Sequence, residues 1–480
     1  MGLLGAKEMS MKFDYLILGN GAIGMFSAIQ IKRAFPASKV GIVGHPDRVN
    51  SASVAAGAMC NVYGELEHSY SDQMRILQDI SFRYGVKGKN GWLDFVNEFN
   101  LEASLLTAKN TLIFLKSNPS EFEVRNFTKS RTDSKDNSVL RNLTASEIQN
   151  FFANVEQKPE DAFFVEYEFA LDTRQLFKIF STLCQSLGIE MIDDEIAQID
   201  TSTKIVITKK NRISASKFIV ALGAATKDLL PEHGIQQILS GVGSAIEIST
   251  DKINASFGSG NSVIRTVNRG GAQCGFHFVP RKSGYYLGAG NYIKTAGESS
   301  HRLETIRYLI NTFERELAGT DVTYQIEGDI IKGHRPRALD GFPLVGPLSK
   351  APDFFAVSGT NRAGLTWAPA ISSQILSWCQ DKDQTVLPAE LEKIILPDRT
   401  PLSFGTEDEA IEYYVESRVG AAIEHGRVLN NAGAITTEKS RLKIYATELL
   451  ADVQSVSGCF KVPHPDHWAS ITDNPTLCFP

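Results

Sequence analysis

Two short apolar runs with a helical pattern between them open the chain. Residues 13–18 form an apolar run of strand length, and apolar residues then recur at helical spacing through residues 29–35. Residues 39–43 form a second run of the same kind. A strand, a helix and another strand in this order predict the beginning of a parallel sheet covered by helices.

Apolar and polar residues alternate between residues 241 and 293. The alternation predicts antiparallel strands with one buried face, most clearly at residues 263–267, 276–280 and 285–289. An amphipathic helix is predicted over residues 300–317, with an apolar side formed by Leu303, Ile306, Ile310, Phe313 and Leu317. The polar stretch 126–142 has no such pattern and is predicted to be a solvated loop.

Two further amphipathic helices are predicted beyond residue 388. Thr406 and Glu409 have the spacing of a capping box. The helix that follows ends at Gly426, and its apolar face consists of Ile411, Val415, Val419, Ala422 and Ile423. A second helix near residues 440–453 aligns Leu442, Tyr445, Leu449 and Val453. Both faces must be buried, either on the rest of this chain or in a contact with another subunit or a partner protein.

The composition is that of an ordinary globular protein of two or three domains. The chain has 480 residues, 42% of them hydrophobic, and 49 Lys and Arg against 55 Asp and Glu give a net charge of −6. This balance gives no reason to expect a nucleic-acid partner. No apolar run is long enough to span a membrane and no signal peptide is recognisable, so a cytoplasmic location is expected.

No metal site is predicted. The six cysteines lack CxxC spacing and are expected to be reduced and mostly buried. His464, Asp466 and His467 are expected to form a polar turn flanked by prolines.

The first run is followed at once by a glycine-rich turn with the spacing GxGxxG. Gly19 allows a tight turn, Gly21 allows a pyrophosphate to approach the backbone, and Gly24 allows the helix to pack on the strand. The N-terminus of that helix offers free N–H groups to phosphates. A dinucleotide is therefore predicted, and this motif alone does not separate NAD from FAD. The acid expected after the second strand for the ribose is missing or displaced, because the chain has Gly-His-Pro-Asp at residues 44–47.

Three later segments add specificity to the glycine turn. Residues 51–59, Ser-Ala-Ser-Val-Ala-Ala-Gly-Ala-Met, are small and suit a backbone that approaches something flat and wide. Residues 333–346 read G-x-R-P-x-x-x-D-G-x-P-x-x-G. A predicted strand at residues 354–358 is followed by G-x-x-R-x-G-L-T-x-A-P at residues 359–369. A helix is predicted at residues 364–380, and it begins within this motif.

Taken together, these motifs resemble the D-amino-acid oxidase (DAO) superfamily of FAD-dependent oxidoreductases, most closely its glycine oxidase and sarcosine oxidase branch, over residues 12–379. The resemblance implies an α/β fold with a Rossmann-like FAD-binding domain and an inserted antiparallel-sheet substrate domain, plus a C-terminal helical extension. The FAD-binding domain is expected at residues 12–100, 160–240 and 328–388. The substrate domain is expected at residues 101–159 and 241–327, and the extension at residues 389–480.

The resemblance also implies that FAD is the cofactor and is bound non-covalently, because the cysteine that carries the flavin in monomeric sarcosine oxidases is missing near Arg335. A helix N-terminus at Gly364 would stabilise negative charge on reduced flavin. The residues expected to contact FAD are Gly19, Gly21, Ala22, Ile23, Gly24, Ser51, Ser53, Ala55, Ala56, Gly57, Met59, Gly223, Gly333, Gly359, Asn361, Arg362, Ala363, Gly364, Leu365 and Thr366.

Three residues are the candidates for substrate recognition. The resemblance places a carboxylate-binding arginine at Arg335 and a second pocket arginine at Arg362; a guanidinium binds a carboxylate through two parallel hydrogen bonds. His277 stands where glycine oxidase has a tyrosine, and histidine can donate a hydrogen bond or carry charge near neutral pH. Tyr63, Glu65 and His68 are further candidates for the rim of the pocket.

The expected activity is oxidation of an amino acid or small secondary amine at its C–N bond, by hydride transfer to flavin N5 with oxygen as acceptor, followed by hydrolysis of the imine to an oxo acid. One alternative is a 2-hydroxy-acid or amine dehydrogenase that uses a quinone or protein acceptor. Another is a flavin-binding subunit whose C-terminal extension docks a catalytic partner.

Overall fold

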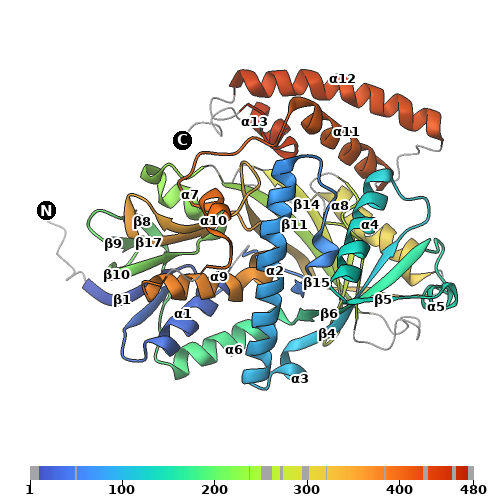
Figure 1. Cartoon of the computed structure of the whole chain (residues 1–480). Helices are drawn as coiled ribbons and strands as arrows, with labels where there is room; N and C mark the ends of the chain where they lie inside the picture. Colours follow the sequence, from blue (N-terminus) through green and yellow to red (C-terminus); the bar gives the residue numbers. More distant parts are fainter. Residues whose placement is uncertain are drawn as a thin grey trace, which may run out of the picture.

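Two β-sheets organise the computed structural model, one mainly parallel and one mainly antiparallel. The long helix α2 (Asp72–Glu98) runs between them, and the helices beyond residue 406 lie across one end of the molecule (Figure 1). The structure describes residues 10–48, 51–236, 238–249, 262–270, 274–294, 302–319, 322–382, 385–424, 431–456 and 461–473.

The parallel sheet is built around β1 (Ser10–Leu18). β1 pairs with β10 (Arg212–Val220) on one side and β2 (Val40–Val43) on the other, and the helix α1 (Ala22–Ala34) connects β1 to β2. Leu16, Ile17 and Leu18 are fully buried, as expected of a strand that is covered on both faces. The predicted strand, helix and second strand are therefore confirmed.

Further strands extend this sheet on both sides. β7 (Glu190–Ile192) adds to β2, and β17 (Ala351–Ser358) adds to β10, both in parallel. β16 (Leu344–Leu348) completes the edge in the antiparallel sense. The pair β8 (Ile196–Asp200) and β9 (Ile205–Thr208) is attached to β10.

Helices cover the parallel sheet with apolar side chains. On one face, α1 packs with α2, α6 (Thr173–Ser186) and α9 (Gly364–Cys379) around Ile29, Trp92, Phe180 and Ile371. On the opposite face, a second core with Leu16, Val220 and Phe354 lies near α7 (Thr226–Leu229). The predicted helix at residues 364–380 is confirmed, with Pro369 inside it.

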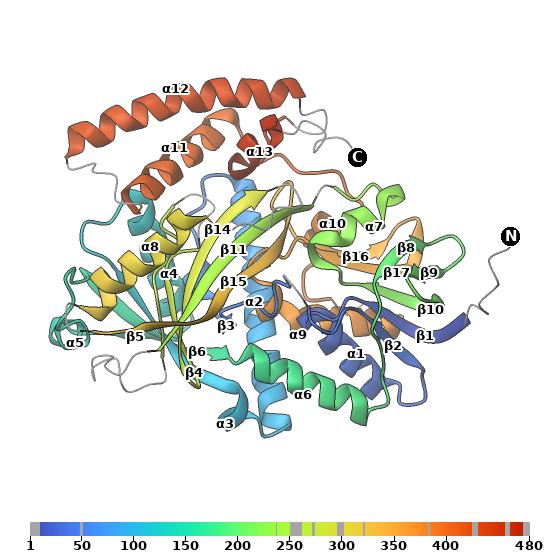
Figure 2. The ribbon, with the colours of Figure 1, turned by 180° about the vertical axis from the view of Figure 1, so that it is seen from behind.

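The second sheet is curled and mostly antiparallel (Figure 2). Its neighbours run in the order β15, β11, β14, β13, β12, β4, β6 and β3, and only β12 and β4 pair in parallel. The bounds are β15 Gln325–Ala338, β11 Ile238–Ser249, β14 Gly284–Lys294, β13 His277–Arg281, β12 Ser262–Arg265, β4 Leu106–Leu115, β6 Asp161–Leu171 and β3 Met59–Cys60, with β5 (Leu140–Asn142) beside β6.

The three strands predicted from alternation are confirmed as β12, β13 and β14, but the single buried face is wrong. Ile264 and Phe278 pack toward α8 (Leu303–Phe313), whereas Val279 and Tyr286 are buried on the other side. That other side is covered by the small-residue segment 51–59, since the Tyr286 hydroxyl donates to Ala55 O. Contacts between remote segments therefore bury a face that the local pattern shows as polar.

The amphipathic helix predicted at residues 300–317 corresponds to α8 and a π-helical turn at Glu314–Ala318. Its predicted start lies partly outside the described residues. Ile306, Phe313 and Leu317 are buried as predicted. Leu303 is not: its side chain is 81% exposed because it stands in the first turn of α8, beyond the edge of the core.

The polar stretch at residues 126–142 is not a solvated loop. Most of it belongs to α4 (Glu121–Asp136), whose N-terminus is capped by Ser120. Asn126 is fully buried because it accepts from His68 N and donates to Asn268 O. The buried face of this helix is polar and forms its hydrogen bonds within the protein. It therefore has no apolar residues at helical spacing, and the sequence does not predict the helix.

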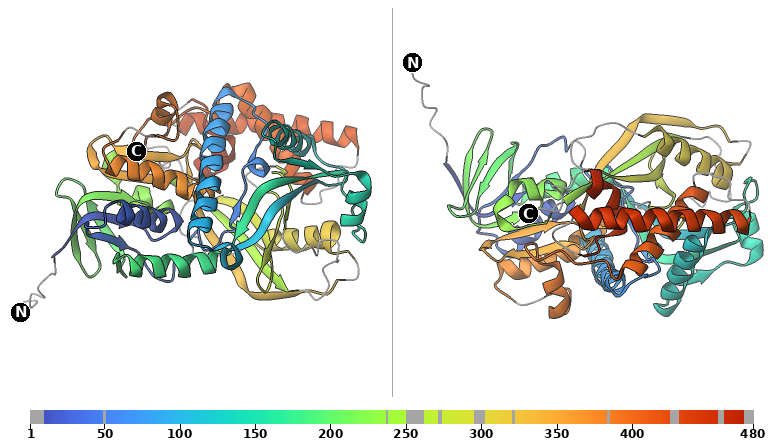
Figure 3. Two further views of the ribbon diagram at one scale, coloured as in Figure 1. Left: turned by 60° about the horizontal axis from the view of Figure 1, so that its bottom comes forward. Right: turned by 90° about the horizontal axis from the view of Figure 1, so that it is seen from above.

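Three helices of the C-terminal extension form a layer at one end of the molecule: α11 (Glu407–Glu424), α12 (Ala432–Val456) and α13 (Trp468–Asp473). Seen from above, the red helix α12 lies across the rest of the chain (Figure 3). The short helix α10 (Ala389–Ile395) lies apart from this layer, beside the parallel sheet, and its Ile395 belongs to the core there. The capping box is confirmed, because Thr406 Oγ1 accepts from Glu409 N and the Glu409 carboxylate accepts from Thr406 N. Gly426, the predicted end of α11, lies outside the described residues.

Apolar faces of the extension are buried on the same chain. Ile411, Val415 and Val419 of α11 share a core with Leu239 and Leu339, and with Leu442, Leu449 and Val453 of α12. Tyr445 departs from the predicted stripe, since it is 48% exposed. A contact of α12 with another subunit or partner stays a prediction.

The predicted domain boundaries also stay predictions. β6 and β15 lie in the antiparallel sheet, although most of their residues fall in ranges assigned to the FAD-binding domain. Of the predicted buried thiols, Cys60, Cys184, Cys274 and Cys379 are buried and free, while Cys459 and Cys478 lie outside the described residues.

Candidate active site

The glycine turn after β1 has the close backbone contacts that its sequence predicts. Gly19 adopts a φ of +111°, and a Cβ there would collide with the carbonyl of Ala221. A Cβ on Gly24 would collide with the carbonyl of Gly19, so this glycine lets α1 pack on β1. Gly21 is the N-cap of α1, next to Ser53, whose Oγ accepts from Ala22 N at 3.1 Å.

A cavity of about 930 Å³ extends from this turn to the antiparallel sheet. It is lined by the glycine turn, the segment 51–59, the β15 residues 333–337 and the loop before α9. Every residue predicted to contact FAD, except Gly24, lines this one cavity. Gly24 instead has the predicted packing role. The contacts themselves stay predictions.

The residues around the cavity fit a flavin dinucleotide. The first turns of α1 and α9 both border the cavity, so their free N–H groups can face phosphates or an anionic ring. Gly333 brings β15 against the segment 51–59, because a Cβ on it would lie 2.6 Å from Ala55 Cβ. The buried Asn361 Oδ1 has no hydrogen-bond partner among the described residues, so an acceptor is available.

Acidic side chains border the cavity at the end of β7 and not at the end of β2. Asp47, the acid nearest the predicted position, is exposed and lies 3.7 Å from His45. Asp194 and Glu195 line the cavity just after β7, the parallel neighbour of β2. No local signal identifies them, because β7 lies far from β2 in the sequence and the sheet order brings the two together.

Arg335 lines the cavity from β15. Its Nη1 donates to Asn291 Oδ1 at 3.2 Å and lies 3.5 Å from Gly290 O. The guanidinium lies over Gly243 of β11, where a Cβ would come 2.5 Å from Arg335 Cζ. Within the described part of the chain, no carboxylate forms an ion pair with Arg335.

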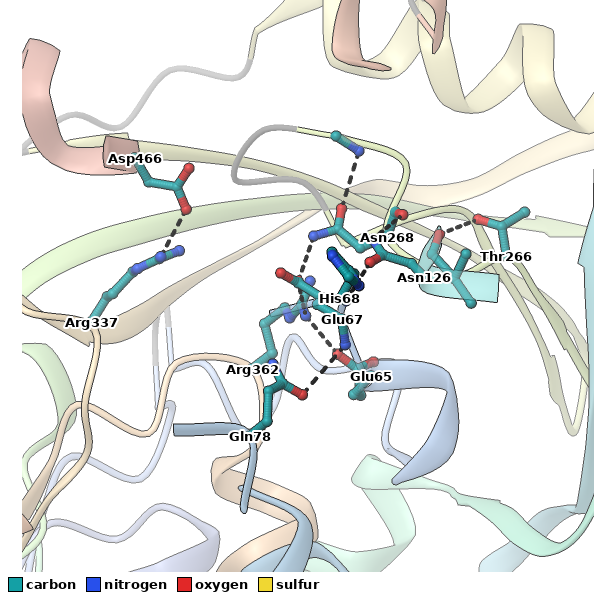
Figure 4. Close-up of polar contacts among 12 residues, drawn as sticks. Glu65, Glu67, His68, Gln78, Asn126, Thr266, Asn268, Arg337, Arg362 and Asp466 are labelled. Carbon is teal, nitrogen blue, oxygen red and sulfur yellow. Dashed lines mark hydrogen bonds and ion pairs between the residues drawn. The ribbon is translucent and has the colours of Figure 1, made fainter. Parts of the chain in front are cut away.

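Arg362 lines the same cavity, but its charge is already engaged by two acids (Figure 4). Its Nη2 lies 2.9 Å from Glu65 Oε2 and 3.5 Å from Glu67 Oε1. Glu65 is also paired with the buried Arg265 at 2.7 Å. Burial raises the pKa of Glu65, yet Arg362 and Arg265 outweigh it and lower this pKa to about 2. Burial raises the pKa of Glu67.

His277 lines the cavity from β13 and is 4% exposed. Burial, together with Arg265, lowers the pKa of His277 well below its ordinary value. The expectation that it can carry charge near neutral pH is therefore corrected, because the imidazole is neutral there. Its Nε2 is buried and has no hydrogen-bond partner in the described residues.

Only one of the three predicted rim residues borders the cavity. Glu65 does, whereas Tyr63 packs against Phe82 and His68 faces Tyr70. Glu67 borders the cavity although the sequence analysis did not select it.

The extension supplies further cavity residues that sequence analysis missed. Tyr413, His464 and Asp466 line it, and Asp466 Oδ2 lies 2.8 Å from Nη2 of Arg337 on β15 (Figure 4). Arg337 follows Arg335 by two residues, so strand periodicity could have identified it. Asp466 had no such signal, because only the docking of the extension brings it to β15.

Among the described residues, no helix is long and apolar enough to cross a membrane. No group of His, Cys, Asp and Glu side chains in the described ranges has the arrangement of a metal site. The turn containing His464 and Asp466 instead joins the cavity wall.

Comparisons with known proteins support a flavin enzyme. The family model "DAO: FAD dependent oxidoreductase" matches residues 14–377. A glycine oxidase structure from Geobacillus kaustophilus has a TM-score of 0.65 at 16% identity, covering 79% of this chain and 98% of that one. Iminodiacetate oxidase from Chelativorans sp. BNC1 has a TM-score of 0.63 at 16% identity, covering 80% and 98%. L-proline dehydrogenase from P. horikoshii has a TM-score of 0.65 at 15% identity, covering 82% and 98%. No curated protein matches the sequence.

Proposed function

Because the chain belongs to the DAO family of FAD-dependent oxidoreductases, we propose that it oxidises an amino acid or small secondary amine at the C–N bond, with oxygen as electron acceptor. The product imine is then hydrolysed by water to an oxo acid. Similar solved structures include a glycine oxidase and an iminodiacetate oxidase, which supports this substrate class.

The observation that carries the proposal is the state of Arg335. Four arginines line the cavity. Arg48 lies beside the glycine turn, where its Nε donates to Asn20 O, and Arg337 and Arg362 are each paired with acids of the chain. Arg335 donates only to an amide oxygen and a backbone carbonyl in the described residues. A half-buried cation that has no anionic partner among the described residues suits a substrate carboxylate, which a guanidinium can bind through two hydrogen bonds.

The cofactor residues have distinct roles in this proposal. The turn at Gly19 to Gly24 holds the pyrophosphate of FAD at the N-terminus of α1. The N-terminus of α9, beginning at Gly364, stabilises negative charge at the flavin ring. FAD supplies the two-electron acceptor when it is bound, and we expect it to be held without a covalent bond.

The remaining cavity residues position the substrate. Arg362 is held in place by its ion pairs with Glu65 and Glu67 and forms a fixed side of the cavity. Neutral His277 can hydrogen-bond the substrate without adding charge. Burial of the substrate amine in this cavity favours its neutral form, because desolvation disfavours an ammonium. A neutral amine is the form that can be oxidised at its C–N bond, so no side-chain base is required.

The proposal is tested by an anaerobic screen of the FAD-loaded protein. D-amino acids, L-amino acids, N-methylated amines and 2-hydroxy acids are added in turn, and bleaching of the visible flavin band is recorded. We expect bleaching by at least one amino acid and, on admission of air, stoichiometric hydrogen peroxide. Bleaching without peroxide would replace the oxidase by a dehydrogenase. If only 2-hydroxy acids bleach the flavin, or if nothing does, the amine substrate class is wrong.

A further inference from the structure

The C-terminal extension forms part of the wall of the candidate active site. Tyr413 belongs to α11, and His464 and Asp466 belong to the turn before α13. All three line the same cavity as Arg335. The family match ends at residue 377, so this wall lies outside the part of the chain that identifies the family. Such a wall is suited to determine which substrate this particular chain accepts.

The centre of this wall is the ion pair between Arg337 and Asp466. Both side chains are largely buried, with 10% and 6% of their surface exposed. The Tyr413 hydroxyl lies 3.4 Å from both carboxylate oxygens of Asp466, and Arg337 Nη2 lies 3.4 Å from His464 Nε2. Burial and Arg337 hold the pKa of His464 well below its ordinary value, so this ring is neutral.

The wall therefore combines hydrogen-bond donors and acceptors with no net charge. Arg337 supplies one positive charge and Asp466 one negative charge, while Tyr413 and His464 are neutral. Arg337 Nε is buried and has no hydrogen-bond partner among the described residues, so the guanidinium is not saturated by the protein.

Arg337 and Arg335 lie on the same face of β15. They are two residues apart in one strand, so their side chains project in the same direction. Their Cα atoms are separated by roughly 6.6 Å, twice the rise per strand residue. The guanidinium of Arg335 leans away from Arg337, because it lies over Gly243, which pairs with Gly333. A substrate whose carboxylate binds Arg335 therefore needs a side chain of several carbons to reach the Arg337–Asp466 pair.

Resting on the proposed function, we infer that this pair selects substrates whose far end is an uncharged hydrogen-bonding group, such as a carboxamide. A carboxamide can donate to Asp466 and accept from Arg337. A second carboxylate would be attracted by Arg337 and repelled by Asp466, and an ammonium would meet the opposite pair of forces. Neither charged end gains net attraction to offset its desolvation. A substrate with an apolar far end would remove water from Arg337 and Asp466 without offering them a hydrogen bond.

The test uses the FAD-loaded full-length protein without oxygen and three ligands that have no amino group on the carbon next to the carboxylate. Glutaramate, glutarate and 4-aminobutanoate each carry one carboxylate for Arg335, and their other ends are an amide, a carboxylate and an ammonium. Dissociation constants are obtained from the change in visible flavin absorption. The wild type should bind glutaramate at least about tenfold more tightly than the other two ligands. One additional hydrogen bond to a charged group changes a dissociation constant by about this factor. Because this binding requires no turnover, its outcome is separate from that of the substrate screen.

Single substitutions should redirect the preference by charge. Asp466→Asn leaves Arg337 without its anion and should make glutarate the tightest ligand, about tenfold or more above glutaramate. Arg337→Gln leaves Asp466 without its cation and should favour 4-aminobutanoate. The double variant restores a neutral wall and should again prefer the amide. The two single variants act independently, so either one decides the question if the other fails to fold.

A matched control is the ion pair of Arg399 with Asp340. Arg399 also belongs to the extension and its partner is buried, but neither residue lines the cavity. Arg399→Gln should lower the melting temperature and leave the order of the three ligands unchanged. The inference is overturned if the wild type shows no preference for glutaramate or binds none of the ligands. It is equally overturned if Asp466→Asn keeps the wild-type order, or if Arg399→Gln changes the order as much as Asp466→Asn does.

Discussion

The guanidinium of Arg335 lies directly over Gly243, on the neighbouring strand of the antiparallel sheet. A Cβ at residue 243 would come within 2.5 Å of Arg335 Cζ, closer than two carbon atoms can approach. The position of the proposed carboxylate-binding group therefore depends on the absence of a side chain at residue 243.

Gly243→Ala should lower kcat/KM for a carboxylate-bearing substrate by about 100-fold, because displacing a binding group by about 1 Å costs that much. Flavin content should be unchanged, since Arg335 is assigned to the substrate. Steady-state kinetics on the amino acid and on the matching amine without a carboxylate measure the effect. An equal loss for both substrates would show that the substitution disturbs more than Arg335.

Arg335→Ala should lower kcat/KM for an amino acid by roughly 30- to 5,000-fold. An unpaired buried carboxylate costs on the order of 2–5 kcal/mol, and each 1.4 kcal/mol is tenfold. Arg335→Lys should recover part of the loss, since an ammonium keeps the charge and lacks the planar donor pair. The control is again the amine without a carboxylate. If Arg335→Ala impairs that amine as strongly, the residue is not a carboxylate-binding group.

Gly21→Val should give a folded, colourless protein. The new side chain would stand at the start of α1, where Ser53 Oγ already lies 3.3 Å from a Cβ position, and would occupy the space of the pyrophosphate. Absorbance near the visible flavin band and the circular dichroism spectrum measure the two properties. In the wild type, acid precipitation should release free FAD. Colour in the variant, or flavin retained in the acid pellet, contradicts non-covalent binding at this turn.

Truncation after Pro388 should cause aggregation or loss of flavin. The extension covers Leu239 and Leu339, together with Met74 and Phe122, and its removal exposes this apolar surface. Light scattering and the ratio of flavin to protein absorbance report the two outcomes. A truncated protein that is soluble, loaded with flavin and fully active would show that the extension neither stabilises the chain nor completes the site.

Glu65→Gln should lower the free energy of unfolding at neutral pH, and this loss of stability should disappear in acid. Arg362 and Arg265 lower the pKa of Glu65 from 4.5 to about 2 in the folded protein. A lowered folded pKa stabilises the fold above pH 4.5, and this contribution is lost as the pH falls toward 2. Denaturant unfolding across that range should therefore give a difference between wild type and variant that shrinks with falling pH. A constant difference would place the stabilising role of Glu65 elsewhere.

The sequence predicted the parts of the fold that depend on neighbouring residues. The turn at Gly19 and the helix beginning at Gly364 each lie in one continuous segment, so their glycines and apolar periods identify them. Arg335 was selected through a motif on a single strand. The helix α4 was missed because its buried Asn126 bonds to polar groups of remote segments and adds nothing to an apolar period.

The charge state of His277 and the presence of Asp466 in the cavity could not be predicted in the same way. His277 is neutral because burial and the nearby charge of Arg265 lower its pKa. The residues next to His277 in the sequence indicate neither effect. Asp466 reaches Arg337 only after α11 and α12 have packed on the antiparallel sheet. Electrostatics and long-range docking, which act between segments, decide both cases.

The two ends of the cavity are made at different times. At about 5–20 residues per second, Gly19 is synthesised roughly 20 to 90 s before Asp466. A nascent chain can thus form the nucleotide turn long before the wall with Asp466 and Tyr413 exists. Until then the cavity stands open to water on that side, so synthesis and docking of the extension are needed to enclose the site.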